Sequence, residues 1–314
     1  MMRIGVDIMG GDFAPRLTTL GAIKAYEQLP SNVELVLFGK KEQILEIFKE
    51  VNFNPNNVKI HNTNEVIGMG EHPAKTFQQK PDSSIAVGFR ELLAGNIDGF
   101  ASAGSTGAML VGAMHTIKSI PGVIRPTITA AFPKLDGGNL IVCDVGINVD
   151  CKPDILYQYA ILGSLYAENV YGIKNPRVGL LNIGSEEEKG NLLTKSAHEL
   201  MKGTKEFNFI GNVEGSDLFS KNDLDVVITD GFTGNVLLKF AESIYNVAQK
   251  RNINDAYLNR FNSESHGGSP VLGVNSVVMI GHGGSSEIAI KNMILHTQSM
   301  AESKIVQKIK ESFK

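Results

Sequence analysis

The fold is decided by residues 97–114, which read IDGFASAGSTGAMLVGAM. Residues 97–101 are typical of a short buried strand, and the apolar run at 109–114 is typical of a buried helix. The turn between them holds Ser102, Gly104, Ser105, Thr106 and Gly107. N–H groups at a helix start lack partners and carry partial positive charge, and glycines let an anion come close. The stretch therefore predicts an anion site, unless Ser105 or Thr106 only caps the helix and the glycines only serve packing.

The same pattern of strand and helix recurs along the chain. Apolar runs typical of strands lie at 4–8, 33–38, 97–101, 140–145, 178–183, 207–210, 226–229 and 277–280. Helical periodicity lies between them at 20–29, 84–93, 154–167, 194–201 and 236–248. This alternation predicts an α/β fold with a mostly parallel sheet covered by helices on both faces.

The domain organisation follows from the same pattern. We expect residues 1–314 to form a single α/β/α catalytic unit, with two lobes as the alternative. Residues 249–268 are polar and rich in asparagine, so they predict a surface excursion. Residues 286–313 predict one long helix or two shorter ones packed on the sheet.

Composition excludes several classes of protein. The net charge of −3 argues against a general nucleic-acid surface. Neither a membrane span nor a signal peptide is visible, so we expect a cytoplasmic protein. Cys143 and Cys151 are too few for a disulfide framework or a thiolate zinc site. Both are expected to be buried as small apolar residues.

Polar clusters follow six of the predicted strands. They lie at 7–12, 102–107, 144–150, 182–191, 230–235 and 281–286. Ligands bind beyond the carboxyl ends of parallel strands, so six clusters rich in groups that hold anions or move protons predict one shared site. The alternative is that these are ordinary turn residues, because Gly, Asn and Asp form turns anywhere.

Common catalytic motifs are missing from the sequence. Neither a G-x-G-x-x-G nor a Walker A loop occurs, and neither H-E-x-x-H nor G-x-S-x-G is present. Asp144, Asp150 and Asp154 offer oxygen ligands for a hard cation. Carboxylates after a strand more often accept backbone bonds or cap a helix, so we expect no metal and interpret Asp154 as a cap. His282 is either a general acid–base or a histidine paired within its turn.

Longer motifs resemble those of the PlsX-type phosphate acyltransferases. They are VDIMGGD at 6–12, SAGSTGA at 102–108, RP at 125–126, DVGINVD at 144–150, LLNIG at 180–184, KGN at 189–191, GN at 211–212, DGFTGNV at 230–236 and GGSP at 267–270. The resemblance covers essentially the whole chain. It implies an isocitrate/isopropylmalate dehydrogenase-like fold and a cytosolic homodimer that needs no cofactor.

The activity implied by the resemblance is transfer of a long-chain fatty acyl group from acyl carrier protein to inorganic phosphate. The acyl phosphate would then feed a membrane glycerol-3-phosphate acyltransferase in phospholipid synthesis. Phosphate is itself the nucleophile in this reaction, so no activated serine or cysteine is needed. The protein must orient phosphate against the thioester and stabilise the oxyanion that forms.

Roles for individual residues follow from this chemistry. Phosphate binding is assigned to Ser102, Gly104, Ser105, Thr106 and Gly107. Lys189 and Asn235 are expected to polarise the carbonyl or pair with phosphate, because one is a compact charge and the other a neutral donor. Asp230 or His282 is expected to handle a proton. The expected substrate-binding residues are Asp7, Asp12, Asp144 and Asn148.

Three departures from the family pattern leave alternatives open. Ser105 stands where asparagine is usual, and Gln78 stands where arginine is common, with Lys75 and Lys80 as substitutes for the charge. The stretch 235–267 is shorter than usual and lacks a basic amphipathic segment, so peripheral membrane association is left open. The alternatives are a non-catalytic carrier-protein or anion binder and an NAD-dependent dehydrogenase of similar architecture.

Overall fold

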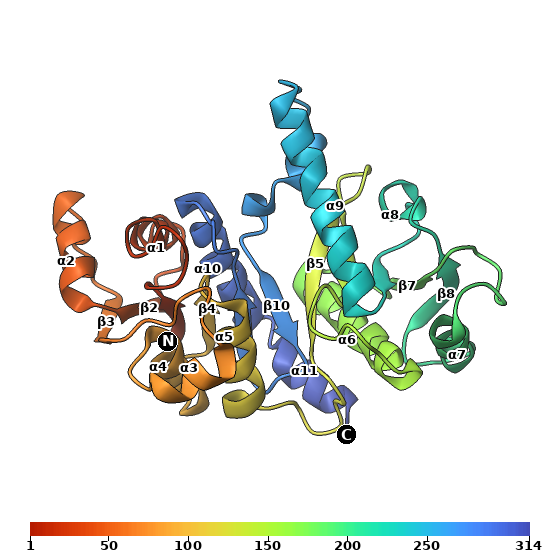
Figure 1. The fold of residues 1–314 in the computed structure, drawn as a ribbon, viewed down its shortest axis with the longest axis horizontal. Helices are drawn as coiled ribbons and strands as arrows, with labels where there is room; N and C mark the ends of the chain where they lie inside the picture. The colour runs from red at the N-terminus through yellow and green to blue at the C-terminus, as the bar shows by residue number, and fades with distance from the viewer. The chain divides into compact units, whose positions relative to one another are not determined.

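The computed structural model describes residues 1–314, which form two compact units (Figure 1). Unit 1 comprises Met1–Ser119 and Ser263–Glu302, and unit 2 comprises Ile120–Asn262 and Ser303–Lys314. In both units parallel strands are interleaved with helices, which confirms the expected α/β class. That the two act as one catalytic unit stays a prediction.

Unit 1 is built on six strands in the order β3-β2-β1-β4-β11-β10. They are β1 (Met2–Asp7), β2 (Val33–Gly39), β3 (Val58–Asn62), β4 (Gly99–Ser102), β10 (Ser269–Leu272) and β11 (Val277–Ile280). All neighbouring strands are parallel except β10, which runs antiparallel to β11. The carboxyl ends of β1, β4 and β11 therefore meet at one edge.

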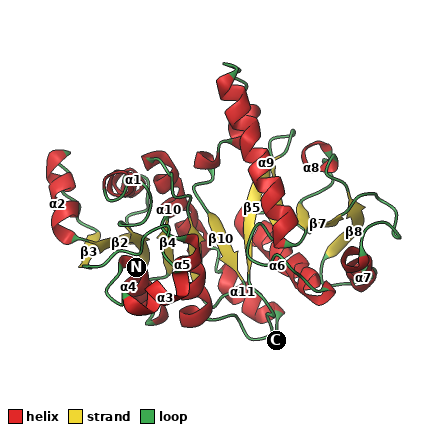
Figure 2. Ribbon diagram, viewed as in Figure 1, coloured by secondary structure: helices red, strands yellow, loops and turns green.

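Helices cover the strands of unit 1 on both faces. They are α1 (Arg16–Tyr26), α2 (Lys41–Glu50), α3 (Pro73–Gln79), α4 (Ser84–Leu93), α5 (Thr106–Val111) and α10 (Glu287–Glu302), with the π-helix η1 (Gly112–Ile117) and the short 3₁₀-helix η3 (Ser263–Ser265). Figure 2 shows α1 and α10 above the strands and α3, α4 and α5 below them. The helix α5 runs directly into η1, so one helical segment spans 106–117.

Unit 2 has five strands in the order β5-β6-β9-β7-β8. They are β5 (Thr127–Pro133), β6 (Asn139–Cys143), β7 (Arg177–Leu181), β8 (Asn208–Val213) and β9 (Val226–Ile228). Only β5 and β6 are antiparallel. The helical elements are α6 (Pro153–Tyr171), α7 (Leu192–Met201), α8 (Asp217–Ser220), α9 (Gly231–Lys250), η2 (Leu258–Phe261) and α11 (Ile305–Ser312).

The structure decides two sequence-based expectations about helix ends. The interpretation of Asp154 as a cap is wrong, because Lys152 is the N-cap of α6 and Pro153 takes the first helical position. Proline fits there because the N–H that it lacks has no helical partner anyway. Of the two alternatives for residues 286–313, the structure has the pair of shorter helices, α10 and α11.

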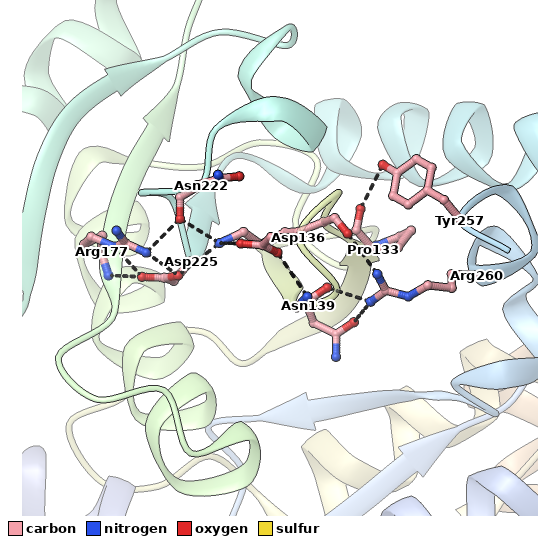
Figure 3. A network of polar contacts seen from close by, with 10 residues as sticks. Pro133, Asp136, Asn139, Arg177, Asn222, Asp225, Tyr257 and Arg260 are labelled. Atoms are coloured by element: carbon pink, nitrogen blue, oxygen red, sulfur yellow. Dashed lines mark hydrogen bonds and ion pairs between the residues drawn. The ribbon is translucent and has the colours of Figure 1, made fainter.

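The expected surface excursion at 249–268 is held partly against the β5–β6 hairpin. Arg260 donates to the carbonyls of Lys134 at 2.8 Å and Gly138 at 2.6 Å, and the Tyr257 hydroxyl donates to the Pro133 carbonyl at 3.2 Å (Figure 3). The Phe261 side chain is buried. A polar composition does not reveal such anchors, because they depend on single side chains.

The same hairpin carries a buried ion-pair network. Asp225 accepts from Arg177 Nε at 2.7 Å and from Lys134 Nζ at 3.4 Å (Figure 3). Burial acts to raise the pKa of Asp225, but the hydrogen bonds and charge of Arg177, with the charge of Lys134, hold that pKa below its usual 3.8. The network ties the hairpin to the start of β7, so its role is structural.

Candidate active site

Three of the predicted polar clusters meet at the carboxyl edge of unit 1. The Ser102 hydroxyl donates to Asp7 Oδ2 at 2.6 Å, and Gly281 N donates to the Ser102 carbonyl at 2.8 Å. Asp12 N donates to the Gly283 carbonyl at 2.8 Å. The clusters at 7–12, 102–107 and 281–286 are thus joined by direct hydrogen bonds, as neighbouring parallel strands require.

Asp7 and Ser102 form a buried pair beneath this edge. Both side chains are at most 1% exposed. Besides accepting from Ser102, Asp7 accepts from Met9 N at 2.9 Å, and Gly104 N donates to Ser102 Oγ at 2.9 Å. Burial raises the pKa of Asp7 above 3.8, although its hydrogen bonds act in the opposite direction. The buried hydrogen bonds of this pair hold the loops at 7–12 and 102–107 together.

Gly10 allows the first two loops to touch. A Cβ placed on Gly10 would lie 2.6 Å from Gly104 N, closer than any side chain tolerates. The backbone of 7–12 therefore lies directly against the turn at 102–107, which fixes the position of that turn.

The turn at 102–107 leads into α5 with its cap in place. Ser105 is buried, and its hydroxyl accepts from Ala108 N at 3.4 Å, so the capping alternative describes this side chain. A Cβ on Gly107 would overlap the ring of Pro73, so this glycine serves packing. Thr106 is exposed, and the N–H groups of Thr106 and Gly107 donate to no group of the protein.

His282 and Asp12 are exposed at the same edge. Gly284 N donates to His282 Nδ1 at 3.3 Å, so the neutral imidazole carries its proton on Nε2. The Ser285 hydroxyl donates to the His282 carbonyl at 2.5 Å, which fixes the backbone of this turn. His282 is therefore both paired within its turn and free at its second nitrogen.

The other three clusters lie in unit 2, after β6, β9 and β7. Asp144 is fully buried and accepts from Asn148 N at 2.7 Å, Ile128 N at 3.2 Å and Gly146 N at 3.3 Å. Asn148 is also buried, and its amide donates to the Pro126 carbonyl at 2.8 Å. Both expected substrate-binding residues thus organise the loop at 144–150.

The start of α9 is packed on this loop. Asp230 is the N-cap of α9, with its carboxylate accepting from Thr233 N at 2.9 Å and from the Thr233 hydroxyl at 2.8 Å. Gly231 N donates to the Asn148 carbonyl at 2.8 Å, and a Cβ on Gly234 would overlap the Asp144 carbonyl. Asn235 follows on the exposed side of the first turn, and its side chain makes no hydrogen bond.

Lys189 lies in the exposed loop at 183–190, after β7. Its ammonium forms neither an ion pair nor a hydrogen bond, although Glu186, Glu187 and Glu188 precede it. Two apolar side chains near it, Ile183 and Leu192, are more than 80% exposed. The loop therefore presents a free cation, with two exposed apolar side chains near it in the sequence.

Lys75 and Lys80, the two lysines expected to replace the charge of the arginine that is common at position 78, differ in their environments. Lys80 donates to Glu71 Oε1 and Oε2 at 2.8 Å, and this hydrogen bond lowers the pKa of Glu71. Lys75 is exposed and unpaired. Of the two, only Lys75 has a charge that is free to meet an anion.

The expectation that both cysteines are buried is wrong for one of them, Cys151. Cys143 is buried, and burial raises the pKa of its thiol well above the usual value. Cys151 is half-buried, and burial together with the charge of Asp144 raises its pKa to about 11. Neither thiol is activated as a nucleophile at neutral pH.

Comparison with known proteins decides the family. The model of a family described as "Fatty acid synthesis protein" matches residues 2–308. A phosphate acyltransferase of Dictyoglomus turgidum is 39% identical, covering 99% of this chain and 97% of its own length. One of Desulfitobacterium hafniense is 41% identical with the same coverage. The chain belongs to the fatty acid synthesis protein family.

Solved structures support the fold of this family member. A phosphotransacetylase from Streptococcus pyogenes is similar with a TM-score of 0.68 and 20% identity, covering 96% of this chain and 94% of its own. A 4-hydroxythreonine-4-phosphate dehydrogenase from Burkholderia phymatum is similar with a TM-score of 0.51 and 15% identity, covering 99% and 98%. At these identities the likeness concerns the fold alone, and it confirms the class expected from the sequence.

Some residues that shape these loops were missed by the sequence analysis. His198 and Asn212 help to hold the loop that carries Lys189, together with Asn182 of the predicted cluster at 182–191, and for the two missed residues the Gly211-Asn212 dipeptide was the only signal. It was visible as a motif without a role. The strand β8 extends to Val213, beyond the predicted end at 210, so Asn212 lies on a strand.

Proposed function

We propose that this protein transfers a long-chain fatty acyl group from acyl carrier protein to inorganic phosphate, giving an acyl phosphate. The observation that carries the proposal is the match to phosphate acyltransferases over 99% of this chain. In the reaction a phosphate oxygen attacks the thioester carbonyl, a C–O bond forms and the C–S bond breaks. The thiol of the carrier leaves, and the acyl group never attaches to the protein.

Phosphate is held, in this proposal, by the turn at 102–107. The free N–H groups of Thr106 and Gly107 and the exposed Thr106 hydroxyl are the donors that support this assignment. Ser102 and Ser105 contribute by fixing the turn, since both hydroxyls already make hydrogen bonds inside the protein. Gly104 and Gly107 contribute through their backbone and their packing.

Lys189 and Asn235 are our candidates for the groups that polarise the carbonyl or pair with phosphate. Both are exposed and neither has a partner, so they are free to meet a substrate. His282 is a better candidate for the proton than Asp230. Its Nε2 is free, whereas both carboxylate oxygens of Asp230 accept hydrogen bonds from Thr233.

The partners remain part of the proposal. Acyl carrier protein as the donor, a homodimer and delivery of the product to a membrane glycerol-3-phosphate acyltransferase follow from the resemblance alone. No helix of the chain combines the length and the apolar character needed to cross a bilayer. Peripheral contact with a membrane is proposed only as a property to test with vesicles.

The direct test is an acyl-transfer assay on the purified protein. Palmitoyl-acyl carrier protein is mixed with the protein and inorganic phosphate, and hydroxylamine traps any acyl phosphate. We expect loss of palmitoyl thioester that depends on phosphate, with one hydroxamate formed per thioester consumed. Binding of phosphate without turnover by a folded sample would support a non-catalytic anion binder instead, and a melting temperature raised by NAD would support a dehydrogenase.

A further inference from the structure

The loop at 183–190 is attached to the body of unit 2 through two backbone carbonyls. Asn212 Nδ2 donates to the Glu186 carbonyl at 2.8 Å, and Asn182 Nδ2 donates to the Lys189 carbonyl at 3.1 Å. Lys189 N donates in turn to the Glu186 carbonyl at 3.1 Å. The Glu186 carbonyl thus joins Asn212 to the backbone of Lys189.

Asn212 is itself held in one orientation. It is 4% exposed, and its Oδ1 lies 3.2 Å from Nδ1 of His198, another buried side chain. The ring of His198 packs edge-on against Phe209, with ring centres 5.2 Å apart. Because Asn212 Nδ2 is used on Glu186, its oxygen is the acceptor and His198 carries a proton on Nδ1. A flipped amide would place its oxygen against the Glu186 carbonyl, which can only accept, so the Glu186 contact sets the orientation of Asn212.

The same histidine also faces the side chain that follows Glu186. His198 Nε2 lies 3.9 Å from Glu187 Oε1, and Lys202 Nζ donates to Glu187 Oε2 at 2.6 Å. Glu187 is therefore occupied by His198 on α7 and by Lys202, which follows the last residue of that helix. Glu187, one of the three glutamates that precede Lys189, is thus not available to pair with it.

We infer that Asn212, oriented by His198, is a positioning residue for Lys189. By fixing the Glu186 carbonyl it sets the course of the loop, so that the ammonium stays unpaired and in one place for the acyl substrate. The inference rests on the proposed acyl transfer for its kinetic consequence. Its structural consequence, an ordered loop at 186–190, is independent of any activity.

The structural consequence is tested by hydrogen–deuterium exchange on the full chain. Asn212→Ala and the more conservative Asn212→Asp both remove the donor to Glu186, and Asn212→Asp keeps an acceptor for His198. Asn169→Ala is the matched control, since it removes an amide that donates to the Leu165 carbonyl at the same 2.8 Å on α6. We expect exchange of the Lys189 N–H, the amide of this stretch that is hydrogen-bonded, to rise at least about tenfold in both Asn212 variants and to stay unchanged in the control, because local opening governs exchange. Unchanged exchange of this N–H in the Asn212 variants would overturn the inference.

The kinetic consequence is tested by a double-mutant cycle. A misplaced catalytic group costs roughly ten- to a hundredfold in rate, so Asn212→Ala should lower kcat by that factor with little change in KM. In a Lys189→Met background the same substitution should change kcat less than about twofold, because the group that it positions is gone. Equal slowing in both backgrounds would contradict positioning through Lys189. Absence of acyl phosphate with the unaltered protein would refute the proposed function, and the exchange result would still decide whether Asn212 holds the loop.

Discussion

The turn at 102–107 in unit 1 and the loop at 183–190 in unit 2 use polar residues in opposite ways. In the first, the hydroxyls of Ser102 and Ser105 point into the protein, and only Thr106 and backbone N–H groups are left for a ligand. In the second, the side-chain amides of Asn182 and the buried Asn212 hold the backbone, and a charged side chain is left free. The comparison shows that a polar side chain at a strand end can serve to hold a loop in place rather than to bind a ligand.

The largest effect is expected at Lys189, the free charge that we place in catalysis. Lys189→Met keeps the length of the side chain and removes its charge. Loss of one group that stabilises the oxyanion costs roughly a hundred- to a thousandfold in kcat. The melting temperature should not change, since the ammonium has no partner. Steady-state kinetics and calorimetry measure both, with the exposed Lys195→Met as control. Turnover of Lys189→Met within twofold of the unaltered protein would remove Lys189 from the mechanism.

The next effect concerns the buried Asp7–Ser102 pair in unit 1. Ser102→Ala removes the Ser102 hydroxyl from Asp7 and leaves Gly104 N without its acceptor, at a cost of about 1 to 3 kcal/mol in the free energy of unfolding. Urea unfolding measures this cost. Thr106→Val is the comparison variant, because its exposed hydroxyl supports no internal contact. If both variants were equally stable, the Ser102 hydroxyl would not hold the two loops together.

A smaller effect is expected at the helix cap. Ser105→Ala should cost about 1 kcal/mol in the free energy of unfolding, because the N–H of Ala108 loses its cap. The KM for phosphate should change little, since the hydroxyl is not free for an anion. Ser105→Asn, which retains a capping oxygen, should restore the stability. A steep rise in the KM for phosphate with unchanged stability would instead make Ser105 a direct ligand.

The smallest effect is a dependence of stability on pH at Asp7. Burial raises its pKa in the folded protein above 3.8, so the folded state binds this proton more tightly than the unfolded state does. The stability that Asp7 contributes is therefore present below 3.8 and is lost as pH rises through the folded pKa. Asn does not titrate. As pH rises over that range, the free energy of unfolding of Asp7→Asn should therefore increase relative to that of the unaltered protein. Urea unfolding of both proteins upward from pH 3.8 measures it, and a difference independent of pH would show that the pKa is not raised.

Most of the fold could be predicted because buried strands are apolar runs. The missed strands are those whose residues break this pattern. The edge strand β3 mixes polar and apolar residues, β5 contains two alanines and a proline, and β10 has only four residues, one of them proline. Two of these, β5 and β10, are also the antiparallel strands, so the sequence pattern favoured a more uniformly parallel sheet.

The candidate site could be predicted as a set of loops but not as a set of contacts. Parallel neighbours place strand ends together, so the grouping of Asp7, Ser102 and Gly281 followed from topology. The direction of each side chain did not, because it depends on contacts such as that between Gly10 and Gly104. His198 gave no sequence signal, since a single histidine in a helix looks like any other.

The central claim is that phosphate itself attacks the acyl carbonyl, with no acyl group carried on the protein. The most direct measurement follows a radiolabelled palmitoyl chain from acyl carrier protein, with and without inorganic phosphate, by denaturing gel and by hydroxylamine trapping. We predict that the label appears in acyl phosphate only when phosphate is present and that the polypeptide stays unlabelled without it. Label bound covalently to the polypeptide in the absence of phosphate would contradict the account.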